Sequence, residues 1–250
     1  MATITVDDSR RAEGIVILRL DRPDQRNAMS IEMVRELTAA LDAIEHEPGV
    51  AAVILVGEGK GFCAGSDVSA LARMDNDGRR DFEEASGRVA RRLSRFAKPV
   101  LAAVHGFAMG GGLTLASACD IVVTAPDAKW SLPEVPIGLF PAWGLASVVD
   151  RVGKMRARRL AWGIDVLDGN EAEAMGLADV VAEGPTASAI AIALQLAALP
   201  RLQTELIKRY FSAERAEEKA DQAANRLFMQ ACSTPEAEIS FARFLAKSGN

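Results

Sequence analysis

The chain has 250 residues, of which 49% are hydrophobic and 25% are charged, a composition typical of a globular protein with a full hydrophobic core. The net charge is −5, with one tyrosine and three tryptophans, so the sequence offers neither the basic patch nor the stacking platforms of a nucleic-acid-binding protein. The three cysteines are odd in number and contain no CxxC pair, which favours reduced thiols and a cytoplasmic setting. The N-terminal MATITVDDSRR has acids and no apolar run, so we expect no signal peptide.

The first half of the chain alternates predicted strands with predicted helices. A β-branched strand over 14–20 leads into a turn-rich stretch, after which Ser30 caps a helix whose apolar residues recur at helical spacing. The apolar strand over 50–56 is of the kind that is buried on both faces of a sheet. A glycine-rich loop, a polar helix over about 79–96 and an apolar strand over 99–104 follow.

The second half continues this rhythm and then becomes helical. The loop HGFAMGGG, a short helix to about residue 118 and the strand DIVVTA extend the alternation, which favours an α/β fold over an all-helical or sandwich fold. From about Thr186 onward nearly every segment is helix-forming, and we expect no strand after 180–182. We therefore divide the chain into a core at residues 1–190 and a helical C-terminal region at residues 191–250.

Two glycine-rich loops each follow a buried strand and precede a helical segment. They are FCAGSD at 62–67 and GFAMGGG at 106–112. Backbone N–H groups are free at such places, and glycine lets a ligand approach the backbone closely. Two such loops can aim two N–H donors at one oxygen, as an oxyanion hole requires, although each loop alone is also explained as a tight packing turn. A dinucleotide site fits the second loop poorly, because its spacing is G-x-x-x-G-G-G.

Other kinds of site find little support. The two histidines are His46, among acidic residues at a helix end, and His105, which is better explained as a hydrogen-bonded turn residue than as a metal ligand, so we expect no metal. Cys63 has no partner base beside it and is interpreted as a small buried hydrophobe. The stretch 99–119 carries no formal charge, but glycines and polar residues interrupt it, so we expect no membrane span.

Taken together, these motifs resemble the crotonase (enoyl-CoA hydratase/isomerase) superfamily over nearly the whole chain. The resemblance lies in LDRPDQRNAMS, GKGFCAGSDVSAL, KPVLAAVHGFAMGGGLTLASACDIVVTAPDAKWSLPEVPIGLFP and EAEAMGLADVVAE. It implies a crotonase-like spiral of ββα units, with a helical C-terminal region that covers the pocket and builds homotrimers or hexamers. It also implies an acyl-CoA substrate from fatty acid metabolism, with coenzyme A as part of the substrate and no permanently bound cofactor.

The same resemblance assigns roles to residues of this sequence. The oxyanion donors are the backbone amides of Ser66 and Gly111. The family's hydratases carry glutamates three and 23 residues after the middle glycine of GGG, and these positions are Thr114 and Glu134 here. Thr114 is no acid or base near neutral pH, although it can hold a water or a substrate hydroxyl. The expected coenzyme A site consists of Arg22, Arg26, Ala28, Ala64, Gly65, Ser66, Asp67, Val68, Ser69 and Gly111. The expected acyl pocket consists of Leu139, Phe140 and Trp143, with Trp130 as a further candidate and a core role as the alternative for each.

The single glutamate favours one reaction of the family over the others. One carboxylate suits the removal of a proton from one carbon and its return at another, so we expect an enoyl-CoA isomerase (3-enoyl to 2-enoyl) with Glu134 as base. A 2-enoyl-CoA hydratase or related hydratase-lyase is the alternative, because the family's hydroxycinnamoyl-CoA hydratase-lyases pair a serine with that glutamate. Ala142, where some members carry an aspartate, argues against dienoyl isomerases and aryl dehalogenases. A non-catalytic or RNA-binding relative is a remote alternative.

Overall fold

A sheet of six strands and a sheet of three organise the residues that the computed structural model describes, 2–212 and 217–247. In order across the larger sheet, the strands are β1 (Ile4–Asp7), β2 (Ile15–Leu20), β3 (Ala52–Gly57), β4 (Val100–Val104), β6 (Ile121–Thr124) and β9 (Val180–Val181). Neighbouring strands are parallel except β1 and β2, which are antiparallel. The central strands β3 and β4 are fully buried runs of aliphatic residues and glycine, because helices cover both faces of a parallel sheet.

Two strands of the smaller sheet directly follow strands of the larger sheet along the chain. It consists of β5 (Phe107–Met109), β7 (Lys129–Ser131) and β8 (Val166–Leu167), and Cys63 extends it by an isolated parallel bridge to Ala108. The chain therefore leaves β4 for β5 and leaves β6 for β7, and at these two turns it places one strand in each sheet before a helix follows. The expected α/β fold with a spiral of ββα units is confirmed.

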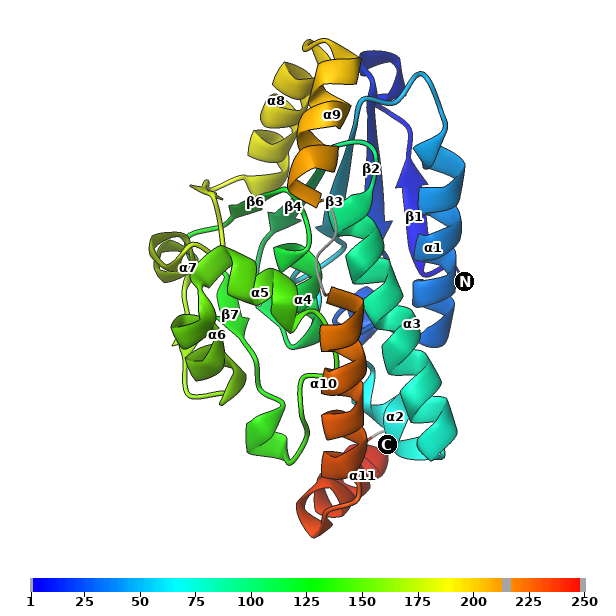
Figure 1. Cartoon of the computed structure of the whole chain (residues 1–250), viewed down its shortest axis with the longest axis vertical. Helices are drawn as coiled ribbons and strands as arrows, with labels where there is room; N and C mark the ends of the chain where they lie inside the picture. The colour runs from blue at the N-terminus through cyan, green and yellow to red at the C-terminus, as the bar shows by residue number, and fades with distance from the viewer. Residues whose placement is uncertain (1, 213–216, 248–250) are drawn as a thin grey trace.

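Helices enclose the two sheets (Figure 1). In chain order they are α1 (Ile31–Glu45), α2 (Val68–Arg73), α3 (Asn76–Arg95), α4 (Gly111–Ser117), α5 (Leu145–Val152), α6 (Lys154–Ala161), α7 (Gly169–Met175), α8 (Pro185–Ala197), α9 (Arg201–Ser212), α10 (Glu217–Cys232) and α11 (Pro235–Lys247). Short 3-10 turns are η1 (Arg11–Glu13), η2 (Pro23–Gln25) and η3 (Val135–Ile137). Helix α3 begins three residues before the predicted position 79, because the side chain of Asp75 accepts the Gly78 N–H at 2.8 Å and caps the helix there.

The two faces of the larger sheet bury separate hydrophobic cores. Because side chains alternate along a strand, Val53 and Leu55 of β3 pack with residues of α1 and α3, whereas Ile54 and Val56 pack with α8. Helix α8 thus packs against one face of the larger sheet. The expected division of the chain between residues 190 and 191 falls inside this helix. Beyond it, α10 lies against α3 and α11 against α2, so the end of the chain returns to the helices of its first half (Figure 1).

A buried lysine helps to attach helix α9 to the core. The side chain of Lys208 donates to the carbonyl oxygens of Leu93 and Lys98 at 3.0 and 2.9 Å, and its Nζ lies 2.6 Å from Oδ2 of Asp120. Among the described residues, no single helix is long and apolar enough to cross a membrane. The pair α8–α9 reaches that length and composition only jointly, across a bend of 112°.

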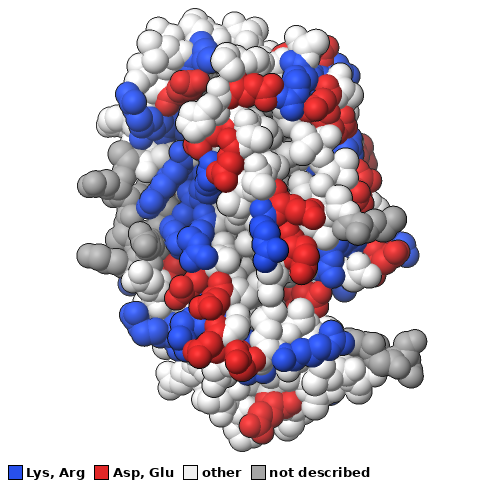
Figure 2. Space-filling view, turned by 90° about the vertical axis from the view of Figure 1, so that its right-hand side faces the viewer, with Lys and Arg blue, Asp and Glu red and all other residues white. Residues whose placement is uncertain are grey.

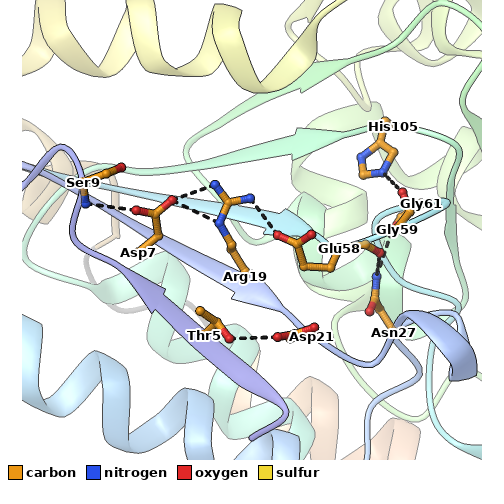
Figure 3. A network of polar contacts seen from close by, with 10 residues as sticks. All are labelled: Thr5, Asp7, Ser9, Arg19, Asp21, Asn27, Glu58, Gly59, Gly61 and His105. Carbon is orange, nitrogen blue, oxygen red and sulfur yellow. Dashed lines mark hydrogen bonds and ion pairs between the residues drawn. The ribbon is translucent and has the colours of Figure 1, made fainter.

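Buried polar contacts fasten the loop after β2 to the loop after β3 (Figure 3). Asn27 is fully buried and donates to the carbonyl oxygens of Glu58 and Gly61 at 2.8 and 2.9 Å. Nearby, a ring nitrogen of His105 lies 2.9 Å from the carbonyl oxygen of Gly59, which confirms that His105 is a hydrogen-bonded turn residue. These contacts fix the loop that carries Arg22 and Ala28 beside the first glycine-rich loop.

Candidate active site

The two glycine-rich loops lie against each other. Gly65 and Gly110 both have left-handed backbone, with φ of 91° and 53°, and a Cβ on Gly65 would lie 2.9 Å from the amide nitrogen of Gly111. Within the described residues, the amides of Ser66 and Gly111 donate no hydrogen bond, whereas the adjacent Gly110 N–H donates to the carbonyl oxygen of Ser131 at 2.9 Å. Two open N–H donors on touching loops are an arrangement that can hold the oxygen of an enolate.

Glu134 lies beside the second of these loops, at the start of η3. A Cβ on Gly110 would come within 2.6 Å of Oε1 of Glu134, so only glycine leaves room for this carboxyl group. The residue is partly exposed along its length, but its Oε2 is buried and has no hydrogen-bond partner. Burial, together with a smaller contribution from the nearby carboxylate of Glu83, raises the pKa of Glu134 to about 7. A carboxyl group with such a pKa can both take and return a proton near neutral pH.

Thr114 projects from α4 towards the same pocket. Its side chain is 1% exposed, and its Oγ1 donates to the carbonyl oxygen of Gly111 at 3.1 Å. The hydroxyl proton is therefore already used by the backbone one turn earlier, and only its lone pairs remain for a water or a substrate. The side of Thr114 is also closed by Gly144, where a Cβ would lie 2.5 Å from that of Thr114.

A small pocket joins these groups. It is small, with about 60 Å³ of free space. Of the predicted site residues, the structure gathers in its lining Ala64, Gly65, Ser66, Val68, Gly111, Thr114, Glu134, Leu139, Phe140 and Trp143. Phe228 of α10 lines it as well. Trp130 does not, because its indole lies in the core and donates to the hydroxyl of Thr124 at 3.1 Å.

The remaining predicted coenzyme A residues, Arg22, Arg26, Ala28, Asp67 and Ser69, lie outside this lining. Nη2 of Arg22 lies 3.1 Å from Oδ2 of Asp67, whose other oxygen caps α2, and the guanidinium of Arg22 also donates to the carbonyl of Ala28. The guanidinium of Arg26 lies 4.4 Å from the ring centroid of Phe107. Outside the pocket lining, Arg22 thus contacts the end of the first glycine-rich loop and the side chain of Arg26 contacts the second.

The pocket contains a second carboxyl group that the sequence analysis missed. Glu83 of α3 is 3% exposed and accepts hydrogen bonds from Nε1 of Trp143 at 2.7 Å and from Oγ of Ser66 at 3.3 Å. Burial raises the pKa of Glu83 to about 7, although these two hydrogen bonds act in the opposite direction. A signal was present in the sequence, because Glu83 shares helical spacing with the buried residues Ser86, Ala90 and Leu93. In the highly charged segment RRDFEEASGR, however, it resembles a residue of a solvated face.

Other cavities and reactive groups do not form a comparable site. Burial raises the pKa of the Cys63 thiol to about 12, so Cys63 is not a nucleophile, and the described residues include no cluster of ligands that could hold a metal ion. A groove of about 870 Å³ between α1 and α3 is larger than the pocket, but Arg92 there is paired with Asp42 and Glu45. Figure 2 shows basic and acidic side chains interspersed on this side of the molecule.

Comparisons with known proteins show the family and the fold of this chain. The family model for enoyl-CoA hydratase/isomerase matches residues 10–249. A crotonyl-CoA hydratase of Syntrophomonas wolfei is 34% identical over 69% of this chain and 67% of its own length. A probable enoyl-CoA hydratase of Mycobacterium bovis is 31% identical over 98% of this chain and 95% of its own. The crystal structure of an enoyl-CoA hydratase/isomerase from Mycobacterium paratuberculosis superposes with a TM-score of 0.88 at 27% identity, covering 97% of this chain and 98% of that one. The chain belongs to the enoyl-CoA hydratase/isomerase (crotonase) family.

Proposed function

We propose that this protein isomerises 3-enoyl-CoA thioesters to 2-enoyl-CoA thioesters. Glu134 takes a proton from C2, the amides of Ser66 and Gly111 hold the oxygen of the resulting enolate, and a proton is returned at C4. The observation that carries this proposal is the unpaired, buried Oε2 of Glu134 beside two open backbone amides. Thr114 adds no base, because its hydroxyl is neutral and its proton is bonded to the backbone.

The coenzyme A part of the substrate supplies binding energy away from the reacting carbons. Arg22 and Arg26, beside the first glycine-rich loop, are the cations that we propose for its phosphates, with no resident cofactor required. Calorimetry with a short acyl-CoA and with the matching free acid tests this part. The thioester should bind and the free acid should not bind measurably, whereas equal affinities would contradict a coenzyme A site.

Hydration of a 2-enoyl-CoA is the second candidate. It is favoured by Glu83, which places another carboxyl group in the pocket, since two carboxyl groups can divide the activation of a water from the delivery of a proton. Several relatives are also named as hydratases, including a short-chain-enoyl-CoA hydratase of Clostridium acetobutylicum that is 36% identical over 68% of this chain.

The deciding experiment compares two substrates with purified protein. Isomerisation of a 3-enoyl-CoA should be faster than hydration of crotonyl-CoA, and Glu134→Gln should lower both by at least about 100-fold while thioester binding persists. Faster hydration by the wild type would move the hydratase to first place. A loss below about tenfold in Glu134→Gln would reject Glu134 as the base.

We also propose a trimer or a hexamer. Its support is a row of exposed apolar side chains on and just before α9, which a monomer would leave in water. The row consists of Leu199, Leu202, Leu206, Ile207, Tyr210 and Phe211. Light scattering that finds a monomer at micromolar concentration would contradict this assembly.

A further inference from the structure

We propose that Glu83 is a second proton-transferring residue of the pocket. Glu134 acts at C2 of the substrate, and Glu83 acts at the other reacting carbon, which is C4 in an isomerisation. The inference rests on the proposed enolate chemistry at Glu134. It assigns a chemical role to a residue of α3, a helix in which the sequence motifs indicated no functional residue.

The first argument is position. Glu83 reaches the pocket from α3, whereas Glu134 reaches it from the start of η3, so the two carboxyl groups enter from different elements and share the enclosed space. Both donors to Glu83, Nε1 of Trp143 and Oγ of Ser66, bond to its Oε2. Within the described residues, Oε1 of Glu83 has no hydrogen-bond donor, which leaves this oxygen for a substrate or a water.

The second argument is the absence of a counter-ion. Asp221, another buried acid among the described residues, is paired with Arg91. Glu83 forms no ion pair among the described residues, and its donors are a neutral indole and a neutral hydroxyl. Burying an ionisable carboxyl without a cation is costly, and a glutamine could accept the same two hydrogen bonds without that cost. A group that has to gain and lose a proton accounts for the carboxyl at this position.

In an isomerisation with two carboxyl groups, every proton that is removed is matched by one that is delivered. The C2–H bond breaks, its proton passes to the Glu134 carboxylate, and the electron pair forms the dienolate held by the amides of Ser66 and Gly111. The O–H bond of protonated Glu83 then breaks as a C4–H bond forms. One proton passing from Glu134 to Glu83 through solvent restores the starting state. In a hydration, Glu83 would instead take the proton of the water that bonds C3, while Glu134 gives a proton to C2.

The first test separates Glu83 from Glu134 with two reactions. Exchange of the C2 proton of butyryl-CoA in D₂O, followed by NMR, needs only Glu134 and the two amides, whereas enoyl-CoA turnover needs both carboxyl groups. Glu83→Gln should lower turnover by at least about 100-fold and exchange by less than about tenfold. Glu134→Gln should abolish both, and the matched control Glu84→Gln, one residue along the same helix, should change neither.

Two outcomes would overturn the inference: turnover in Glu83→Gln within about tenfold of the wild type, or turnover and exchange falling together, which would make Glu83 a packing residue. Exchange that persists in Glu134→Gln would instead contradict the proposed function, so the two failures are distinguishable. A measurement on the wild type needs no variant. When a 3-enoyl-CoA carrying deuterium at C2 is isomerised in ordinary water, two carriers leave no deuterium at C4. Deuterium retained at C4 would show that one base carries both protons.

Discussion

Replacing Glu134 by glutamine should make the protein more stable at alkaline pH. Burial raises the pKa of this carboxyl group from 4.5 to about 7, so between these values the native protein holds a proton that the unfolded chain releases. The free energy of unfolding of the wild type therefore falls as pH rises through this window, and the proton-linked stabilisation is fully present only below pH 4.5. Glutamine is neutral throughout and removes this dependence.

The pKa values set the size of the effect. A difference of 4.5 to about 7 corresponds to roughly 3 kcal/mol at pH 8, and to less than about 1 kcal/mol at pH 5. In a chain of this length, that is on the order of 5–10 °C in Tm at the higher pH. Glu83 contributes in the same direction, so the variant should flatten the pH dependence without abolishing it.

Thermal unfolding of the wild type, Glu134→Gln and the control Glu84→Gln at pH 5 and pH 8 measures this effect. Equal protein concentrations are needed, because the proposed assembly would also stabilise the folded state. Glu134→Gln should exceed the wild type in Tm at pH 8 but not at pH 5, while Glu84→Gln follows the wild type at both pH values. A Glu134→Gln curve that declines with pH as steeply as that of the wild type would refute the reasoning that this carboxyl is buried without a compensating partner.

Two further substitutions test the positions of single groups. Gly110→Ala places a methyl group 2.6 Å from Oε1 of Glu134 at a φ of 53°, so kcat should fall by at least about 100-fold, whereas Gly49→Ala, with nothing within 4 Å, should have normal kinetics. Lys208→Met removes a buried cation from Asp120 and leaves the carbonyl oxygens of Leu93 and Lys98 without this donor, which should cost about 1–3 kcal/mol in urea unfolding. Adding Asp120→Asn should recover part of that loss, and a Lys208→Met protein as stable as the wild type would contradict a stabilising role for Lys208.

Several features of this protein could be predicted from local sequence. The continuous apolar strands at 50–56 and 99–104 predicted a parallel sheet buried on both faces, because such strands have no polar side to turn to water. The two glycine loops were recognised because a left-handed φ and a close backbone approach at Gly65 and Gly110 require glycine. The candidate role of Glu134 followed from the resemblance to the crotonase family, and the structure brings Glu134 and both loops together.

Only the tertiary structure decided which side chains share the pocket with Glu134. Glu83 lies 51 residues earlier in a charged helix, and its burial depends on the packing of α10 against α3 and on the indole of Trp143. Helical spacing alone does not tell a buried carboxyl from a solvated one, because the free energy of either depends on contacts made by distant segments. For the same reason, the hydrogen bond that occupies the hydroxyl proton of Thr114, and the approach of Phe228 to the pocket, became visible only in the fold.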